Sequence, residues 1–160
     1  MRTVEKLIAL CRQKGHTVSV AESCTGGLLA GILTSVPGSS AVFMGGVVAY
    51  DNAVKQSMLG VKVEVLQRDG AVSETTAEAM ALGVRKKLNT TFAMATTGIA
   101  GPSGGSRNKP VGLVYIAVAG PQGHQVQRHV FSGDRAVIRR KACHAAIKAL
   151  LSYIEAVKVP

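Results

Sequence analysis

The chain contains no tryptophan, three phenylalanines and three tyrosines, so that 4% of its residues are aromatic. Proteins that bind single-stranded nucleic acid stack bases on aromatic side chains, and few are available here. The sequence also has no DNA- or RNA-binding motif. The net charge is nevertheless +10, with 19 lysines and arginines against 9 acidic residues. We therefore expect the positive charge to attract a small anionic substrate rather than nucleic acid.

Cysteine is scarce as well. Three are present, at Cys11, Cys24 and Cys143, and their odd number and wide separation match neither a disulfide framework nor the spacing of metal ligands. The sequence has no H-E-x-x-H motif, no C-x-x-C motif and no acidic cluster. We therefore expect neither a metal nor a cofactor.

No apolar run approaches the roughly 20 residues that a membrane span requires. The N-terminal segment superficially resembles a signal sequence, but Glu5 and Arg12 interrupt it. Its apolar residues recur at the spacing of an amphipathic helix. The prediction is a cytoplasmic protein with no membrane partner.

A length of 160 residues suits a single domain over residues 1–160, which buries about 70% of the surface of the unfolded chain. Apolar periodicity predicts an N-terminal helix and a second helix that ends before Pro37. Residues 61–70 suit either a strand or a short helix, and we favour the helix. Further helices are predicted over residues 52–60, over 73–88 and from Asp134 onward, and strands over residues 16–22, 41–51, 91–98, 111–120 and 124–131. Helices and strands alternate over most of this order, which predicts an α/β protein, a three-layer α/β/α sandwich with a mixed β-sheet.

The stretch "AESCTGG", residues 21–27, lies between a predicted strand and a predicted helix. One interpretation is that Ser23 or Thr25 caps the helix and that the glycines form a tight turn. The other is that Ser23 is a nucleophile beside a helix N-terminus, where backbone N–H groups stabilise a negative oxygen. The G-x-S-x-G pattern of a nucleophile elbow is absent, so spacing alone leaves both open.

A serine nucleophile needs a base, and none of the four histidines lies in a glycine-rich or strand-end motif. "VAYDNAVK" offers Tyr50 at the end of a strand and Lys55 about one helical turn further. If this strand lies beside the one that leads to Ser23, Lys55 could act as a neutral amine base. The Tyr50 hydroxyl would then relay the proton or orient the amine. The alternative is that Lys55 is a solvated lysine on a helix.

The segment "TTGIAGPSGGSRNKPVG", residues 96–112, holds five glycines between two predicted strands. Such a segment is either a loop whose backbone N–H groups bind an anion or a compact surface loop without a ligand. Arg135 falls in the first turn of the last helix, where a cation is unfavourable against the helix dipole. It either holds a phosphate or is an ordinary surface arginine.

Five segments, "AESCTGG", "GGVVAYDNAVKQSMLGV", "GAVSETTAEAMA", "TTGIAGPSGGSRNKPVG" and "FSGDR", together resemble one family, the CinA C-terminal domain. Its members are nicotinamide-nucleotide amidohydrolases, and the match runs in order from about residue 3 to 155. The resemblance implies hydrolysis of the carboxamide of nicotinamide mononucleotide to nicotinate mononucleotide and ammonia, in pyridine-nucleotide salvage. It also implies a metal-free, cofactor-free enzyme and a homodimer, which an alanine-rich last helix suits.

The resemblance further assigns roles to residues. Ser23 is the implied nucleophile, Lys55 with Tyr50 the base system, and the backbone of Thr25, Gly26 and Gly27 the oxyanion site. The implied substrate-binding residues are Glu22, Asn52, Thr97, Gly98, Gly101, Gly104, Gly105, Ser106 and Arg135.

This sequence departs from the family pattern at three positions. Thr97 stands where serine is common, Ser103 where aspartate is common, and Asn108 where an acidic residue often precedes the lysine. The last two lie in the glycine-rich loop and bear on substrate preference.

Two rival hypotheses stay open: Cys24 as the nucleophile, and a catalytically silent module of the same fold that binds nucleotides or nucleic acid. Many relatives carry a further N-terminal domain associated with pyrophosphatase activity, which we do not expect of this chain.

Overall fold

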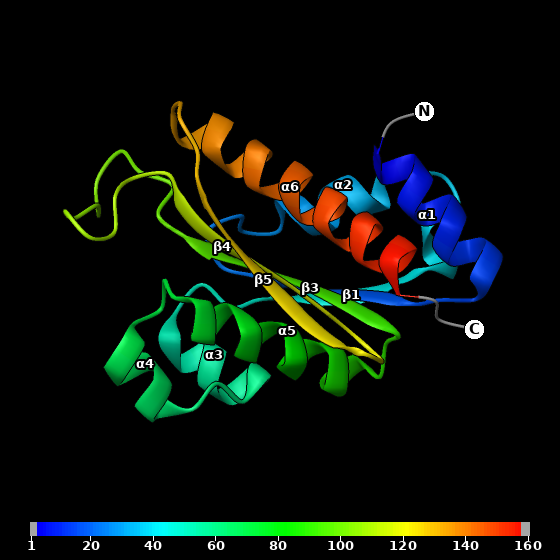
Figure 1. Cartoon of the computed structure of the whole chain (residues 1–160), viewed down its shortest axis with the longest axis horizontal. Coiled ribbons are helices and arrows are strands. Elements are labelled where there is room, and N and C mark those ends of the chain that lie inside the picture. The colour runs from blue at the N-terminus through cyan, green and yellow to red at the C-terminus, as the bar shows by residue number, and fades with distance from the viewer. Residues whose placement is uncertain (1–2, 158–160) are drawn as a thin grey trace.

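A computed structural model describes residues 3–157 of the chain. A five-stranded mixed sheet lies between two layers of helices, in the strand order β2-β1-β3-β4-β5 (Figure 1). β1 pairs in parallel with both β2 and β3, whereas β4 is antiparallel to β3 and to β5. The strands are β1 (Val18–Glu22), β2 (Phe43–Val48), β3 (Phe92–Gly98), β4 (Leu113–Gly120) and β5 (Gly123–Val130). The predicted α/β sandwich is confirmed.

Helices cover both faces of the sheet. α1, α2 and α6 lie on one face, and α3, α4 and α5 on the other (Figure 1). Their bounds are α1 (Thr3–Lys14), α2 (Leu28–Thr34), α3 (Asn52–Leu59), α4 (Val63–Asp69), α5 (Glu74–Leu88) and α6 (Arg135–Ala156), with a short 3-10 helix, η1 (Ser39–Ala41). No helix within residues 3–157 combines the length and the apolar character that crossing a membrane requires.

The two faces of the sheet differ in side-chain size. Toward α1, α2 and α6 the strands present large residues such as Phe92, Met94 and Ile116. Toward α5 they present alanines: Ala21, Ala93, Ala95, Ala117 and Ala119. Small side chains let α5 lie close to the sheet. α3 in turn packs closely on α5, since a Cβ on Gly83 would collide with the Leu59 carbonyl oxygen.

Two expectations about elements are resolved by the structure. The ambiguous residues 61–70 contain a helix, α4, whose inward residue Leu66 packs in the core beside α5. The expected strand over residues 41–51 is shorter, because η1 precedes it and Asp51 caps α3. β1 and β2 lie side by side and run in the same direction, so their carboxyl ends meet at one edge of the sheet.

Candidate active site

Ser23 and Lys55 meet at the carboxyl ends of β1 and β2. Ser23 follows β1 directly, and Lys55 lies in the first turn of α3, which begins after the Asp51 carboxylate accepts a hydrogen bond from the Ala53 N–H. The Nζ of Lys55 is 3.1 Å from the Oγ of Ser23. Both side chains are buried. The alternative that Lys55 is a solvated helix lysine is therefore wrong.

The surroundings of Lys55 favour its uncharged form. The residue is 1% exposed, and its Nζ donates to the carbonyl oxygens of Ala49 at 2.8 Å and Tyr50 at 3.1 Å. Burial lowers the pKa of Lys55 from its ordinary value of 10.5, and the nearby Asp51 carboxylate opposes this only in part. A neutral amine has two N–H groups and one lone pair. The two carbonyls take the N–H groups, which leaves the lone pair for the Ser23 hydroxyl proton.

The carboxylate of Glu22, and neither Ser23 nor Thr25, caps α2. One oxygen of Glu22 accepts from the N–H groups of Gly27 and Leu29 at 3.0 Å each, and the other accepts from Ala30 at 2.8 Å. The Thr25 hydroxyl donates to the same carboxylate at 2.6 Å. Glu22 is fully buried. The capping interpretation of Ser23 is therefore wrong, and Glu22, expected to bind substrate, instead fixes the turn that carries Ser23.

The three backbone N–H groups expected to hold an oxyanion differ in their bonding. Gly26 donates its N–H to the Ser23 carbonyl at 3.1 Å, and Gly27 donates to Glu22. The N–H of Thr25 has no acceptor within residues 3–157. Thr25 itself is fully buried and is not among the residues that line the cavity described below.

A cavity of about 270 Å³ opens above Ser23 and Lys55. Its mouth is bridged by Arg135, whose guanidinium donates to the Gly101 carbonyl and to the Tyr50 hydroxyl at 2.9 Å each. The Tyr50 hydroxyl therefore bonds to Arg135, while the backbone carbonyl of Tyr50 holds Lys55. The lining residues are Ser23, Cys24, Tyr50, Lys55, Ala71, Val72, Gly98, Ile99, Ala100, Gly101, Ser103, Gly104 and Arg135.

Several expected binding residues do not line this cavity. The hydroxyl of Thr97 donates to the Ala71 carbonyl at 2.6 Å, beneath the cavity wall. Ser106 accepts a hydrogen bond from the Lys109 N–H, and Gly105 lies beside it on the exposed outer part of the loop. Asn52 is exposed at the start of α3. The structure brings Gly98, Gly101, Gly104 and Arg135 together, and these four remain as candidates.

Sequence analysis missed two groups that shape the site. Arg139, one turn beyond Arg135 on α6, donates to the Thr25 carbonyl at 2.7 Å, and the Thr25 hydroxyl also bonds to Thr96 at 2.7 Å. Ala71 and Val72, from the segment between α4 and α5, form one wall. The repeat of arginine at i and i+4 was the one available signal for Arg139, since it places both on one face of a helix.

Cys24 lies beside Ser23 in the cavity, yet its surroundings disfavour a thiolate. Burial raises the pKa of Cys24 to about 12, and the Glu22 carboxylate acts in the same direction. The protonated thiol is a poor nucleophile near neutral pH, so the structure favours Ser23 over its neighbour.

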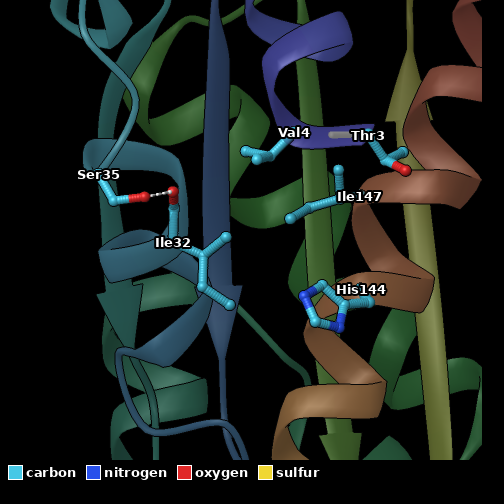
Figure 2. Close-up of a pocket in the computed structure, with 6 residues that line it drawn as sticks. All are labelled: Thr3, Val4, Ile32, Ser35, His144 and Ile147. Atoms are coloured by element: carbon cyan, nitrogen blue, oxygen red, sulfur yellow. Dashed lines mark hydrogen bonds between the residues drawn. The ribbon is translucent and has the colours of Figure 1, made fainter. Parts of the chain in front are cut away.

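A larger cavity, of about 410 Å³, lies between α1, α2 and α6 (Figure 2). Val4, Ile32 and Ile147 extend toward it, and His144 is the titratable side chain among the described residues that line it. None of the residues with expected roles lines it. Within residues 3–157 no group of three or more histidine, cysteine, aspartate or glutamate side chains is placed to hold a metal ion.

The sequence profile described as "CinA C-terminal domain" matches residues 1–154. The chain belongs to this family. A "CinA-like protein" of Parasynechococcus marenigrum is 57% identical over 129 residues, which cover 81% of this chain and 30% of that protein. One from Trichormus variabilis is 52% identical over 145 residues, 88% of this chain and 35% of that protein. The chain thus spans about a third of the length of these curated relatives.

Solved CinA structures share the fold over nearly their full length. The competence/damage inducible protein CihA from Agrobacterium tumefaciens is 43% identical, with a TM-score of 0.86 over 95% of this chain and 96% of that one. The competence damage-inducible protein A from Klebsiella pneumoniae is 31% identical, with a TM-score of 0.92 over 99% and 100% of the two chains.

Proposed function

We propose that this CinA domain is an amidohydrolase that converts nicotinamide mononucleotide to nicotinate mononucleotide and ammonia, with Ser23 as nucleophile and Lys55 as base. The observation that carries the proposal is the 3.1 Å separation of the Lys55 Nζ and the Ser23 Oγ, inside a cavity and with the amine buried. A neutral lysine that touches a serine hydroxyl is a recognised way to activate that nucleophile.

In the first half of the reaction, the Ser23 Oγ attacks the carboxamide carbon while its proton moves to the lone pair of the Lys55 Nζ. The carbonyl oxygen becomes negative, and we assign the Thr25 N–H, which has no acceptor within residues 3–157, as the group that donates to it. Lys55 then returns the proton to the amide nitrogen as the carbon–nitrogen bond breaks. Ammonia leaves, and an ester joins the acyl group to Ser23.

In the second half, a water molecule takes the place of ammonia. Lys55 accepts a proton from the water as its oxygen attacks the ester carbon, and the proton then returns to the Ser23 Oγ as the ester bond breaks. The products are the carboxylic acid and the free enzyme. The carbonyls of Ala49 and Tyr50 hold the amine in place through both halves.

The rim of the cavity suits a substrate that carries a phosphate. Arg135 lies there, and its planar guanidinium can bind two phosphate oxygens at once. Its present acceptors, the Gly101 carbonyl and the Tyr50 hydroxyl, are uncharged, so a phosphate would be a stronger acceptor for the same N–H groups. Gly104 leaves the backbone open to close approach by the ligand, whereas the missing side chain of Gly98 makes room for the backbone of β4 at Leu113.

Ammonia release from nicotinamide mononucleotide, measured with and without a chelator, tests the proposal. Ser23→Ala and Lys55→Ala should each lower kcat by at least about 10³-fold, because each removes one half of the nucleophile–base pair. Ser35→Ala, an exposed serine at the end of α2, is the matched control and should keep wild-type turnover. Undiminished turnover in Ser23→Ala would overturn the mechanism. If the wild-type protein shows no turnover but binds nucleic acid with an affinity that falls steeply with salt, the silent binding module would be favoured instead.

A further inference from the structure

A buried negative charge lies directly behind the proposed nucleophile. Glu22 is fully buried, and its carboxylate accepts only from backbone N–H groups and from the Thr25 hydroxyl. Within residues 3–157 it forms no ion pair. The reaction proposed for Ser23 places a second negative charge, on the carbonyl oxygen of the substrate, beside the same turn. Like charges repel strongly in a buried site, so this reaction needs a positive charge nearby.

Arg139 brings a positive charge to the turn from α6. One terminal nitrogen of its guanidinium donates to the Thr25 carbonyl at 2.7 Å, and the same nitrogen lies 3.3 Å from the place that a Cβ on Gly26 would take. Its Nε is buried and has no acceptor within residues 3–157. A buried N–H without an acceptor costs free energy, so a contribution to stability alone does not explain an arginine at this position.

One peptide unit links Arg139 to the nucleophile. The carbonyl oxygen of this unit is that of Thr25 and accepts from Arg139, while its N–H is that of Gly26 and donates to the Ser23 carbonyl at 3.1 Å. Gly26 has a φ of +57°, which glycine adopts without strain. A rotation of this peptide plane would break both hydrogen bonds and loosen the turn that holds Ser23 opposite Lys55.

The two charges act in opposite directions on the residue beside the nucleophile. Burial raises the pKa of Cys24 to about 12 and the Glu22 carboxylate raises it further, whereas the charge of Arg139 lowers it. Arg139 therefore favours a negative group next to Ser23, as the reaction requires. The described residues that line the cavity do not include Arg139, so its effect reaches the substrate through the turn.

We propose that Arg139 is a positioning residue, which holds the peptide before Gly26 and offsets the charge of Glu22. The proposal rests on the function proposed for Ser23. It gives different tasks to two arginines on one face of α6. Arg135, at the mouth of the cavity, acts on binding of the phosphate, and Arg139, one turn further along, acts on the rate of the chemical step.

Steady-state ammonia release from nicotinamide mononucleotide tests this division. Arg139→Met should lower kcat by about 10²-fold and change KM by less than about 3-fold, because it removes a group that acts on the transition state. Arg139→Lys keeps the charge without the planar fork and should lower kcat by only about 10-fold. Arg140→Met, the exposed neighbour, is the control and should keep both constants. Arg135→Met should instead raise KM.

A second measurement does not depend on nicotinamide mononucleotide. An alkyl fluorophosphonate bonds to an activated serine oxygen and releases fluoride, and intact-protein mass spectrometry follows this labelling. Ser23→Ala, which should not be labelled, shows that Ser23 is the residue that reacts. Arg139→Met should be labelled about 10²-fold more slowly than the wild type, and Arg139→Lys at an intermediate rate. If melting curves show that Arg139→Met does not fold, Arg139→Lys carries both comparisons.

The two measurements distinguish a failure of this proposal from a failure of the proposed function. Slow labelling of Arg139→Met beside a wild type that is labelled but releases no ammonia would refute the substrate and support the positioning role. Labelling of Arg139→Met at the wild-type rate would overturn the positioning role, and so would a raised KM with an unchanged kcat. A wild-type protein that is not labelled at Ser23 would overturn both proposals.

Discussion

Lys55 can accept a proton only in its uncharged form, and an ordinary lysine is almost fully charged at pH 7. The structure answers this demand by burial, which lowers the pKa of Lys55. The carbonyls of Ala49 and Tyr50 orient the amine toward Ser23. The nearest opposing charge is Asp51, which lies in the exposed turn before α3.

The first prediction concerns the pH dependence of the reaction. Because the neutral amine is the active form, kcat/KM should rise with pH through the lowered pKa of Lys55 and then level off. Asp51→Asn removes the charge that opposes the lowering of the pKa, so the rising limb should move to lower pH. The profile is measured by ammonia release in buffers of constant ionic strength. A rising limb that stays in place in Asp51→Asn would contradict this account.

The second prediction separates catalysis from folding. Lys55→Met keeps the volume and removes the amine, so it should abolish turnover. The cost of burying the amine disappears, but the carbonyls of Ala49 and Tyr50 lose their donor, so the melting temperature near pH 7 should change by only a few degrees. The unfolded chain binds the Lys55 proton more tightly than the folded one does. The stability of the wild type should therefore rise with pH from the lowered pKa up to about 10.5, and this rise should be smaller in Lys55→Met.

Among single residues, the sequence predicted those that follow the end of a strand and missed those whose contacts lie far away along the chain. Ser23 and Lys55 were predicted because each follows a recognisable strand. Glu22 was assigned to substrate because nothing local shows that its carboxylate turns back to accept the N–H groups of α2. The bond between Tyr50 and Arg135 joins positions 85 residues apart, which no local pattern reveals.

Among the elements, α2 takes its N-terminal hydrogen-bond acceptors from one side chain outside the helix. Its N-cap residue, Gly27, has no side chain to offer, so Glu22 supplies the acceptors for the first turn. The α2 helix has seven residues and no charge of its own, so it has little intrinsic stability.

The third prediction follows from this capping. Glu22→Gln replaces an acceptor-only carboxylate with an amide that brings its own donors toward buried N–H groups, which should cost roughly 3 kcal/mol in the free energy of unfolding. The kcat should fall as well, because the same carboxylate fixes Thr25. Glu155→Gln, an exposed residue of α6, should change the stability by less than about 0.5 kcal/mol. Urea unfolding and ammonia release measure the two effects.

The fourth prediction compares two helical glycines. Gly83→Ala places a methyl group against the Leu59 carbonyl and should destabilise the protein by about 1 to 3 kcal/mol. Gly31→Ala, on α2, meets nothing within 4 Å and should stabilise it by up to about 1 kcal/mol, since alanine favours a helix. Denaturant unfolding measures both, and equal effects would contradict the close packing of α3 on α5.

The elements themselves were largely predicted because their apolar spacing is strong. The order of strands in the sheet was not predicted, because pairing depends on which strands meet after the helices pack. η1 was also missed, since three residues give no periodic signal.

The whole molecule is strongly positive, and its charge should act on a phosphorylated substrate from a distance. Added salt screens that attraction, so the KM for nicotinamide mononucleotide should rise several-fold between about 20 and 200 mM salt. The kcat should stay constant, because the contact between Ser23 and Lys55 is buried. Nicotinamide riboside, which lacks the phosphate, is the control and should show no such rise. If the KM values of both compounds rose equally with salt, the positive charge of the protein would not be acting on the phosphate of the substrate.

The two faces of the sheet differ in side-chain size, and they should therefore differ in how many amino-acid substitutions they tolerate. On the side where alanines meet α5, an added methyl group has little room against the packed helix, so small side chains are favoured at these five positions. On the side of α1, α2 and α6, bulky aliphatic groups can exchange volume with their neighbours, so several combinations fill the same space. Among relatives, substitutions should therefore be rarer on the face that packs against α5 than on the face that packs against α1, α2 and α6, although both faces are buried.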